Sequence, residues 1–515
     1  MRVDIIGAGP AGALTARLAA LRHPDWAVHL HERLRPDDTF GFGVGLTRAL
    51  LGAVQVADAD MFDRLMAATF RFSSARFSLP QGTIVFGRSH SGAIRRSELL
   101  RILLDGAAEV GAHVHIGTSV HVDQLRSGAD IVVGADGLSS STRERFARHL
   151  GVRITQGRGA FIWCAAEIEL DGAVFHPVRT SDGVFVAHCY PYAAGLSTFV
   201  IEASDKTVER AGFSDRTWES DSASDDEALD YLSDAFVKLL DGARFFGNRS
   251  RWTHFTTLDC LRWSHDNVVL IGDAVATVHP SLESGTKVAL ESAIALVNHL
   301  DKLEDQPILQ TLGEFTRNRR PSVARLQEPA TRSQLWWESF PARMDLSPAR
   351  IAVAYLSRTG VVSLDSLAKS QPNLVTEAIA DFCGLTPRLT PPRNLTEWIL
   401  DQPFHSKTVS LAERRIDALQ MRAHRAGALL FIASGDAWGP EGDAYLQRAR
   451  DRVNAGAELI TLAGLNRRSD VMDRLAVAER IRTETGVAVA IQVDSDHVDI
   501  VADGILAGRA DLVRL

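Results

Sequence analysis

A glycine-rich turn near the start of the chain, Gly7-x-Gly9-x-x-Gly12, constrains the fold more than any other feature of the sequence. The turn follows an apolar and β-branched segment, residues 3–6, which predicts a strand. It precedes an alanine- and leucine-rich segment, residues 13–21, which predicts a helix. Glycines at these spacings permit a tight turn and a close approach of the backbone to a pyrophosphate, and the helix N-terminus offers free N–H groups to it.

An acidic residue completes this first unit. Glu32 lies 20 residues after Gly12, at the end of a second predicted strand over residues 28–32. A carboxylate at this place can accept hydrogen bonds from the hydroxyls of a ribose. The predicted cofactor-binding set of this unit comprises Gly7, Gly9, Pro10, Ala11, Gly12, Glu32 and Arg33. The unit predicts dinucleotide binding but does not distinguish FAD from NAD.

Two further motifs select FAD. The first, residues 132–137 (Val-Val-Gly-Ala-Asp-Gly), ends a predicted strand and contributes Asp136. The second, residues 270–274 (Leu-Ile-Gly-Asp-Ala), ends another strand and contributes Asp273, which can bind the ribityl hydroxyls. Gly285, Thr286 and Lys287 then open a helix whose N–H groups can face the flavin pyrimidine edge, where reduced flavin carries negative charge.

These three motifs, in this order, resemble the single-component FAD-dependent aromatic monooxygenases, whose fold is that of p-hydroxybenzoate hydroxylase. The resemblance implies that Asp136 lies near the pyrophosphate, that Asp273 holds the ribityl chain and that Arg96 faces the FAD pyrophosphate. It also implies that NADH or NADPH binds transiently, because no second GxGxxG unit follows. The implied reaction is hydroxylation of an aromatic substrate by O2, through a C4a-hydroperoxyflavin.

Further segments resemble a narrower branch of that family, from residue 1 to about residue 375. The branch contains salicylyl-CoA 5-hydroxylase and the monooxygenase half of 2-aminobenzoyl-CoA monooxygenase/reductase. The resemblance implies an aromatic substrate, as a free acid or as a thioester on CoA or on a carrier protein. The matching segments are Phe40–Val44, Phe161–Trp163, His188–Tyr190, Ser197–Glu202, Asn248–Trp252, Ser284–Lys287, Arg319–Pro321 and Leu326–Gln327.

The chain departs from the branch at two places beside the expected flavin. Where the branch has Gly-Asp-Ala-Ala-His, this chain has residues 272–276, ending in Ala276. Where the branch has His-Phe-Ser-Ile-Gly, this chain has residues 279–283, ending in Glu283. These changes bear on the substrate more than on the cofactor.

No sequence pattern marks one side chain as the acid or base of the reaction. The family positions of His188, Tyr190 and His279 lie near the substrate cavity, and these residues are the catalytic candidates. Phe42, His188 and Pro280 are the candidates for contact with the substrate. A buried histidine with a structural role is an equally good interpretation of each histidine.

Other classes of FAD protein stay open as alternatives: an oxidase, an epoxidase, a halogenase-like enzyme or a non-hydroxylating protein. A flavin-dependent halogenase would normally carry a Trp-x-Trp-x-Ile-Pro segment, which this sequence lacks. A non-hydroxylating FAD protein would need a blocked substrate cavity, and Ala276 and Glu283 are where we would expect the obstruction.

The order of predicted elements gives an α/β protein. A Rossmann-type FAD-binding domain with following helices, including one over residues 322–340, is expected at 1–159 and 243–385. A β-rich substrate domain at 160–242 interrupts it, and a proline-containing linker at 386–394 leads to a small α/β domain at 395–515. This last domain resembles the end of an FMN-binding barrel but has only about half the residues of a (β/α)₈ barrel. We therefore expect a truncated barrel-like remnant without FMN.

Composition and residue patterns argue against several other classes of partner and site. The net charge of −8 over 515 residues argues against a nucleic-acid partner, and no apolar run is long enough for a membrane helix. The histidine pairs at residues 29–31 and 113–115 lack a third ligand, so no metal site is predicted. Four cysteines without metal spacing and the lack of a signal-peptide pattern predict a cytoplasmic protein. A homodimer stays open.

Overall fold

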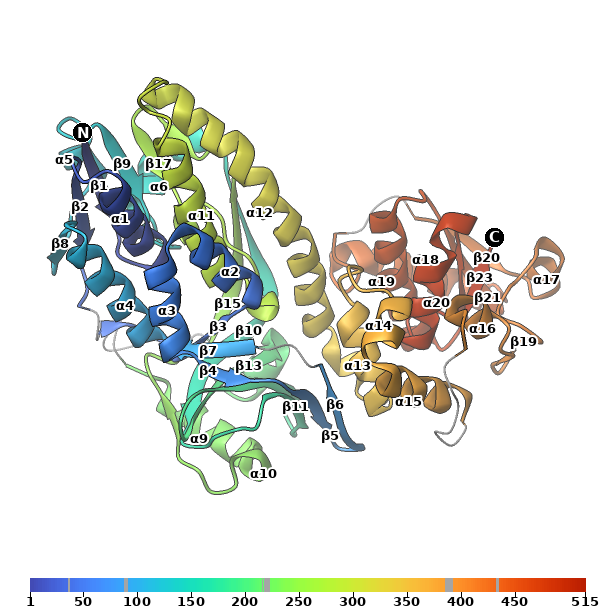
Figure 1. Cartoon of the computed structure of the whole chain (residues 1–515). Coiled ribbons are helices and arrows are strands. Elements are labelled where there is room, and N and C mark those ends of the chain that lie inside the picture. The colour runs from blue at the N-terminus through green and yellow to red at the C-terminus, as the bar shows by residue number, and fades with distance from the viewer. Residues whose placement is uncertain (36–37, 88–90, 215, 217–222, 385–391, 432–434) are drawn as a thin grey trace. The chain divides into compact units, whose positions relative to one another are not determined.

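The computed structural model describes the chain except residues 36–37, 88–90, 215, 217–222, 385–391 and 432–434. The chain forms two compact units (Figure 1). Unit 1 comprises Met1–Arg76 and Gly87–Gln334, and unit 2 comprises Phe77–Phe86 and Leu335–Leu515. Most of the predicted linker at 386–394 lies outside the described residues, and the predicted domain boundaries stay predictions.

The first layer of unit 1 is a six-stranded sheet in the order β16–β17–β9–β1–β2–β8. Its central strands pair in parallel and are apolar and buried, as expected where helices cover a parallel sheet. The predicted βαβ opening is thereby confirmed. The strands are β1 (Arg2–Ile6), β2 (Ala27–Glu32), β8 (His113–Ile116), β9 (Ile131–Gly134), β16 (Ser264–His265) and β17 (Val268–Leu270).

Helices pack on this sheet. The alanine-rich α1 (Pro10–Arg22) lies between α4 (Arg96–Glu109) and α11 (Gly285–Leu300) (Figure 1). Small side chains on α1 let these neighbours approach closely, and ten consecutive residues of α1 are buried. Further helices of unit 1 are α2 (Arg48–Ala57), α3 (Ala59–Ala68), α5 (Val122–Leu125), α6 (Ser141–Arg145) and α7 (Ala147–Leu150). The helix α12 spans Ile308–Glu338.

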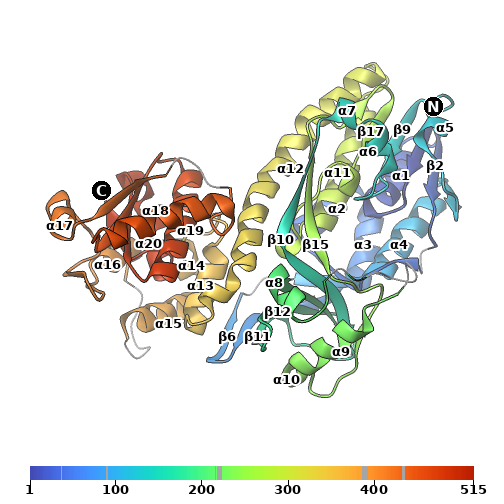
Figure 2. The same cartoon turned by 180° about the vertical axis from the view of Figure 1, so that it is seen from behind.

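The second layer of unit 1 is an antiparallel sheet with its own apolar core. The long strand β10 (Val152–Ala166) pairs with β13 (Leu196–Ser204), β14 (Phe245–Gly247) and β15 (Thr253–Cys260), and Figure 2 shows β10 alongside β15. The strand β12 (Val184–Ala193) joins β11 (Ala173–Arg179) to β13. The helices α8 (Asp205–Arg210), α9 (Asp226–Ala235) and α10 (Val237–Leu240) belong to this layer, and β3 (Gly43–Leu46), β7 (Ser91–Arg95) and β4 (Phe70–Phe72) form a separate small sheet.

Unit 2 is built on a four-stranded parallel sheet whose strands follow chain order, as consecutive strands of a (β/α)₈ barrel do. The strands are β20 (Gly427–Leu430), β21 (Leu459–Ala463), β22 (Ala488–Gln492) and β23 (Leu512–Arg514). The intervening helices are α18 (Pro440–Asn454), α19 (Arg468–Thr485) and α20 (Val498–Leu506). Before the sheet come α13 (Pro348–Ser357), α14 (Leu364–Ser370), α15 (Pro372–Cys383), α16 (Leu395–Leu400), β18 (Phe404–His405), β19 (Ser410–Leu411) and α17 (Ala418–Ala423).

Unit 2 also contains a segment from the N-terminal part of the chain. The fully buried Phe77, in the middle of β5 (Ala75–Leu79), stacks on Phe86 of β6 (Gly82–Phe86). Around it lie the rings of Trp337, Phe340 and Tyr355 at centroid distances of 5.5–6.3 Å. This aromatic packing ties residues 77–86 to the C-terminal part of the chain.

Among the described residues, no helix combines the length and the apolar character that crossing a membrane requires.

Candidate active site

The glycines of the first turn serve two different purposes. Gly7 has a φ of +96°, and a Cβ there would lie 2.5 Å from the carbonyl oxygen of Ala135. A Cβ at Gly12 would overlap the carbonyl oxygen of Gly7, so packing alone requires glycine at both positions. No atom lies within 4 Å of a Cβ built on Gly9, the N-cap of α1, and no side chain caps this helix. The first N–H groups of α1 therefore face space that an anionic group can occupy.

Glu32 lies at the same turn. Its carboxylate accepts hydrogen bonds from the backbone N–H groups of Ala8 at 2.7 Å and Leu34 at 2.8 Å. The strand end of β2 is thus tied directly to the glycine turn, beside the start of α1. Arg33, which follows, is exposed.

The second and third motifs converge on the first. Asp136 accepts hydrogen bonds from Ser140 Oγ at 2.5 Å and Thr142 N at 3.0 Å, and so fixes the start of α6. The buried Arg143 donates to the carbonyl oxygen of Ala274, at 3.1 Å, and joins this loop to the third motif. A Cβ on Gly272 would lie 2.9 Å from the Cβ of Ala11, so the third motif packs against the beginning of α1.

Asp273 and Arg96 lie close enough to interact electrostatically. Desolvation raises the pKa of the Asp273 carboxyl, and the Arg96 guanidinium opposes that shift. Asp273 is nevertheless exposed, so its carboxylate is accessible to a ligand. Arg96 is held from the other side, because its Nε donates to Thr39 Oγ1 at 3.2 Å and its guanidinium lies 4.6 Å from the Phe40 ring centroid.

The start of α11 repeats the arrangement at Gly9. Its N-cap residue, Ser284, forms no side-chain cap, and a Cβ on Gly285 would meet no atom within 4 Å. Lys287 is turned along the helix, where its ammonium pairs with Glu291. Two uncapped helix N-termini with open glycines, together with the Asp273 and Arg96 charges, fit a ligand that carries a pyrophosphate, a polyol and an anionic ring edge. FAD has these groups.

An aromatic cluster includes Phe42 of the residue 39–43 segment. It comprises Phe42, Phe72, Trp163, Tyr190, Tyr192 and Phe246. Glycines make room for it, because a Cβ on Gly41 would overlap the Trp163 ring and a Cβ on Gly43 would overlap Tyr192. The Tyr190 hydroxyl donates to the carbonyl oxygen of Gly43 at 3.0 Å. Two of the predicted residues, Phe42 and Tyr190, thus belong to one aromatic cluster.

The two candidate histidines lie in different surroundings. His188 Nε2 lies 3.4 Å from Glu202 Oε1 on the neighbouring strand, and its ring packs against Phe175. His279 is buried and is the N-cap residue of the short helix η3 (Pro280–Leu282), where its Nδ1 lies 2.8 Å from Ser281 Oγ. Both rings therefore have structural partners, whereas Pro280 is exposed. Catalysis by His188 or His279 stays a prediction.

Glu283 is the residue whose role the sequence left unassigned. It has a φ of +52°, a conformation that favours glycine, and the related branch has glycine here. Its Oε2 would lie 2.9 Å from a Cβ on Gly45, so the carboxylate fills space beside β3. Glu283 is exposed to solvent, but the protein atoms packed around its carboxyl desolvate that group and raise its pKa. Desolvation together with the Glu283 charge raises the pKa of Tyr190. The sequence signal that could have singled out Glu283 was a non-glycine residue at a position where the related branch has glycine. Ala276, in contrast, is fully buried.

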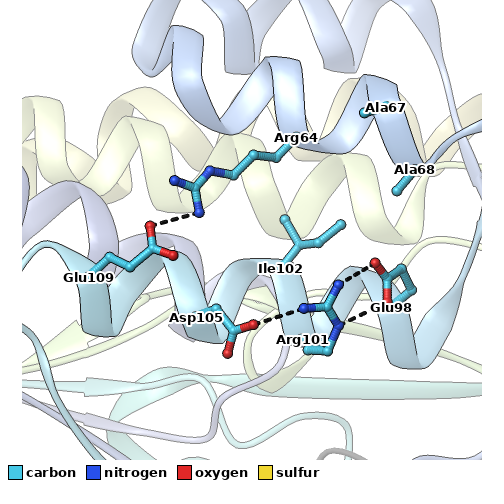
Figure 3. Close-up of a pocket in the computed structure, with 8 residues that line it drawn as sticks. All are labelled: Arg64, Ala67, Ala68, Glu98, Arg101, Ile102, Asp105 and Glu109. Atoms are coloured by element: carbon cyan, nitrogen blue, oxygen red, sulfur yellow. Dashed lines mark hydrogen bonds and ion pairs between the residues drawn. The ribbon is translucent and has the colours of Figure 1, made fainter.

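A pocket of about 480 Å³ lies elsewhere in unit 1, between α3 and α4 (Figure 3). Its charged side chains point toward one another and pair: Arg64 with Glu109 at 2.7 Å, and Arg101 with Glu98 and Asp105. Because these charges are mutually neutralised and the glycine turns lie elsewhere, we assign this pocket no function.

Comparison with known proteins decides the family. Residues 54–328, more than half of the chain, match the family model described as FAD binding domain. The chain belongs to this FAD-binding family. It is 32% identical to salicyloyl-CoA 5-hydroxylase from Streptomyces sp, in an alignment that covers 100% of this chain and 99% of the relative. The protein is therefore an FAD-dependent monooxygenase, which uses FAD and O2.

A second relative of this monooxygenase is shorter. It is the 3-hydroxy-4-methyl-anthranilyl-(aryl-carrier protein) 5-monooxygenase of Streptosporangium sibiricum, which is 33% identical over 72% of this chain and 97% of its own length. Among solved structures, a mutant of 2-methyl-3-hydroxypyridine-5-carboxylic acid oxygenase has the same fold, with a TM-score of 0.53 and 19% identity. That match covers 70% of this chain and 96% of the other. The predicted monooxygenase fold is confirmed.

Proposed function

We propose that this monooxygenase hydroxylates the ring of an aromatic acyl group that is carried as a thioester of coenzyme A. One atom of O2 enters the ring and the other leaves as water, while NADH or NADPH supplies two electrons. The aromatic cluster carries the proposal, because its rings Phe72, Trp163 and Tyr190 are only partly buried and Glu283 lies close enough to Tyr190 to affect its pKa. The names of two relatives support it, since both specify an aromatic acyl group on CoA or a carrier protein.

The chain's own residues supply binding and orientation. FAD, when bound, supplies the redox and oxygen-activating chemistry. We assign the FAD pyrophosphate to the open N-terminus of α1 and to Arg96, a ribose to Glu32, and the ribityl chain to Asp273. The uncapped N-terminus of α11 would stabilise negative charge on the flavin ring, because a helix N-terminus carries free N–H groups and the positive end of the helix dipole. Phe42 and Tyr190 orient the substrate ring.

Glu283 acts as a base in this proposal. An aromatic ring reacts more readily with an electrophilic oxygen when its hydroxyl substituent loses a proton. Glu283 lies beside the aromatic cluster, and its raised pKa brings its proton affinity closer to that of the substituent. The carboxylate then holds the proton that the substituent loses.

Stimulation of coenzyme oxidation tests the proposed substrate class. The FAD-loaded enzyme is supplied with NADH or NADPH and with matched pairs of ligands: salicyloyl-CoA and salicylate, and 2-aminobenzoyl-CoA and 2-aminobenzoate. We expect an aryl-CoA thioester to accelerate NAD(P)H oxidation and its free acid to leave the rate unchanged. Equal rates with thioester and free acid, or stimulation by neither, would exclude thioester recognition. A cytoplasmic location and a homodimer stay predictions.

A further inference from the structure

Three arginines of unit 2 gather around one short segment, residues 506–511. Arg350 on α13 donates from Nε to the carbonyl oxygen of Leu506 at 2.9 Å. Arg482, near the end of α19, donates from Nη1 to the carbonyl oxygen of Gly508 at 3.3 Å. Arg414, which follows β19, donates from Nη1 to the carbonyl oxygen of Asp511 at 3.0 Å. We call these three residues the arginine cluster.

Two of the guanidinium groups contact the same aromatic ring. The Cζ atoms of Arg350 and Arg414 lie 5.5 and 4.5 Å from the ring centroid of Phe382 on α15. A Cβ on Gly508 would lie 3.5 Å from Arg350 Nη2, so this guanidinium lies close over the turn. Ring and turn together hold the side chains in fixed places, which lowers the entropy lost when a ligand binds.

Positive charge in the cluster exceeds the negative charge around it. Asp511 accepts from Arg482 Nε at 2.7 Å and from Val489 N at 3.0 Å. Within the described residues, no carboxylate forms an ion pair with Arg350 or Arg414. The carbonyl groups at the end of α20 offset about half an elementary charge. The unit 2 residues outside the description, 385–391 and 432–434, include neither aspartate nor glutamate.

This imbalance has an electrostatic consequence. Burial and repulsion by Arg482 and Arg414 hold the pKa of Arg350 down to about 10, although Asp381 and Asp511 oppose the shift. Other arginines of unit 2 are neutralised at close range. Arg415, next in the chain to Arg414, lies within 3.1 Å of Glu413 and also pairs with Glu397 and Asp401. A half-buried group of under-compensated guanidiniums favours a bound anion.

We propose that the arginine cluster binds the phosphate groups of coenzyme A. Guanidinium groups bind phosphate through paired, charge-assisted hydrogen bonds. Arg482 keeps 39% of its side chain exposed, so the cluster is accessible from solvent. The choice of coenzyme A over other phosphate esters rests on the proposed function.

The lengths of the relatives agree with this choice. The relative named for a CoA substrate aligns with 100% of this chain and therefore with both units. The relative named for a carrier-protein substrate aligns with 72% of it, which is too little to span both units in full. A site for the phosphates of CoA in unit 2 would serve the first kind of enzyme, whereas a carrier-protein substrate does not carry the nucleotide phosphates of CoA.

Calorimetry with the full-length, FAD-loaded protein tests the site without any turnover. The ligands are CoA, 3′-dephospho-CoA and inorganic phosphate, and the variants are Arg350→Gln and Arg414→Gln. Each variant is expected to weaken CoA binding about tenfold, since each loses one charged hydrogen-bonding partner. Arg415→Gln is the matched control, because it removes a neighbouring arginine that three carboxylates neutralise, and CoA binding should be unchanged.

Several results would overturn the proposal. CoA binding that is equally tight in wild type, Arg350→Gln and Arg414→Gln would show that the cluster only caps the end of α20. Equal affinity for CoA and inorganic phosphate would show a general anion site. If Arg350→Gln does not fold, Arg350→Lys keeps the charge but loses the planar fork, and it must still bind CoA several-fold more weakly. Because no aryl group is present, CoA binding can succeed or fail independently of hydroxylation.

Discussion

Gly9 and Gly12 stand in the same turn but have different surroundings. Gly9→Ala places a methyl group in open space, whereas Gly12→Ala places one against the carbonyl oxygen of Gly7. We expect Gly9→Ala to fold with an unchanged melting temperature as apoprotein and to bind FAD at least about tenfold more weakly. Gly12→Ala should lose about 1–3 kcal/mol of apoprotein stability from overpacking. Thermal unfolding and flavin fluorescence titration measure both effects, and full FAD affinity in Gly9→Ala would contradict the assignment.

Glu283 combines a backbone φ of +52° with a carboxyl pKa that is raised. As a base it acts when ionised, so the hydroxylation rate of the wild type should rise with pH through its raised pKa. In Glu283→Gln this rise should disappear and the rate above that pKa should fall about a hundredfold. The rate profile between pH 5 and 9 measures this. A Glu283→Gln profile that still rises like the wild-type profile would exclude the proposed role.

The same carboxylate affects stability in the opposite sense. A carboxyl whose folded-state pKa is raised contributes stability that is complete below its unfolded pKa and is lost as pH rises through the folded pKa. Glu283→Gln should therefore raise the free energy of unfolding at pH 8 relative to wild type, and less at pH 4. Urea unfolding at the two pH values measures the difference. A variant that is equally or more strongly stabilised at pH 4 would contradict the desolvation of Glu283.

At the scale of elements, one buried arginine joins two of the flavin motifs. Arg143 on α6 donates to Leu138 O at 2.6 Å and to Ala274 O at 3.1 Å. Arg143→Ala leaves these carbonyl groups unpaired and should cost about 1–3 kcal/mol together with a lower FAD content. Arg145→Ala is the control from the same helix, because Arg145 is 47% exposed and pairs with Asp123 at the surface. Equal losses in the two variants would contradict the bridging role.

The strands and helices around the glycine motifs could be predicted because local patterns dictate them. The strand predicted over residues 28–32 is β2 (Ala27–Glu32), and the helix predicted over 13–21 lies within α1 (Pro10–Arg22). The helix predicted over 322–340 begins earlier, as α12 (Ile308–Glu338), and contains Pro321 and Pro329. Proline usually interrupts a helix, so local rules placed the start too late. The φ of Glu283 also depends on tertiary packing that sequence patterns do not encode.

At the scale of the whole molecule, unit 2 encloses a segment that precedes it by some 250 residues in the chain. No sequence pattern predicts that residues 77–86 join the C-terminal unit, since the contacts are long-range and aromatic. A chain ending at Gln334 would leave Phe77 and Phe86 without these partners. We expect it to aggregate, because exposed apolar surface promotes association. Size-exclusion chromatography measures this, and a monomeric, FAD-loaded truncated chain would contradict the division into units.

The central claim is that the FAD-bound enzyme inserts one oxygen atom from O2 into an aryl-CoA ring. It is tested most directly by incubating enzyme, NAD(P)H and an aryl-CoA thioester under ¹⁸O₂ and analysing the acyl group by mass spectrometry. The account predicts one ¹⁸O atom in the ring of the thioester product, with one NAD(P)H oxidised for each oxygen inserted. Oxidation of NAD(P)H that yields hydrogen peroxide and leaves every aryl-CoA thioester at its original mass would contradict it.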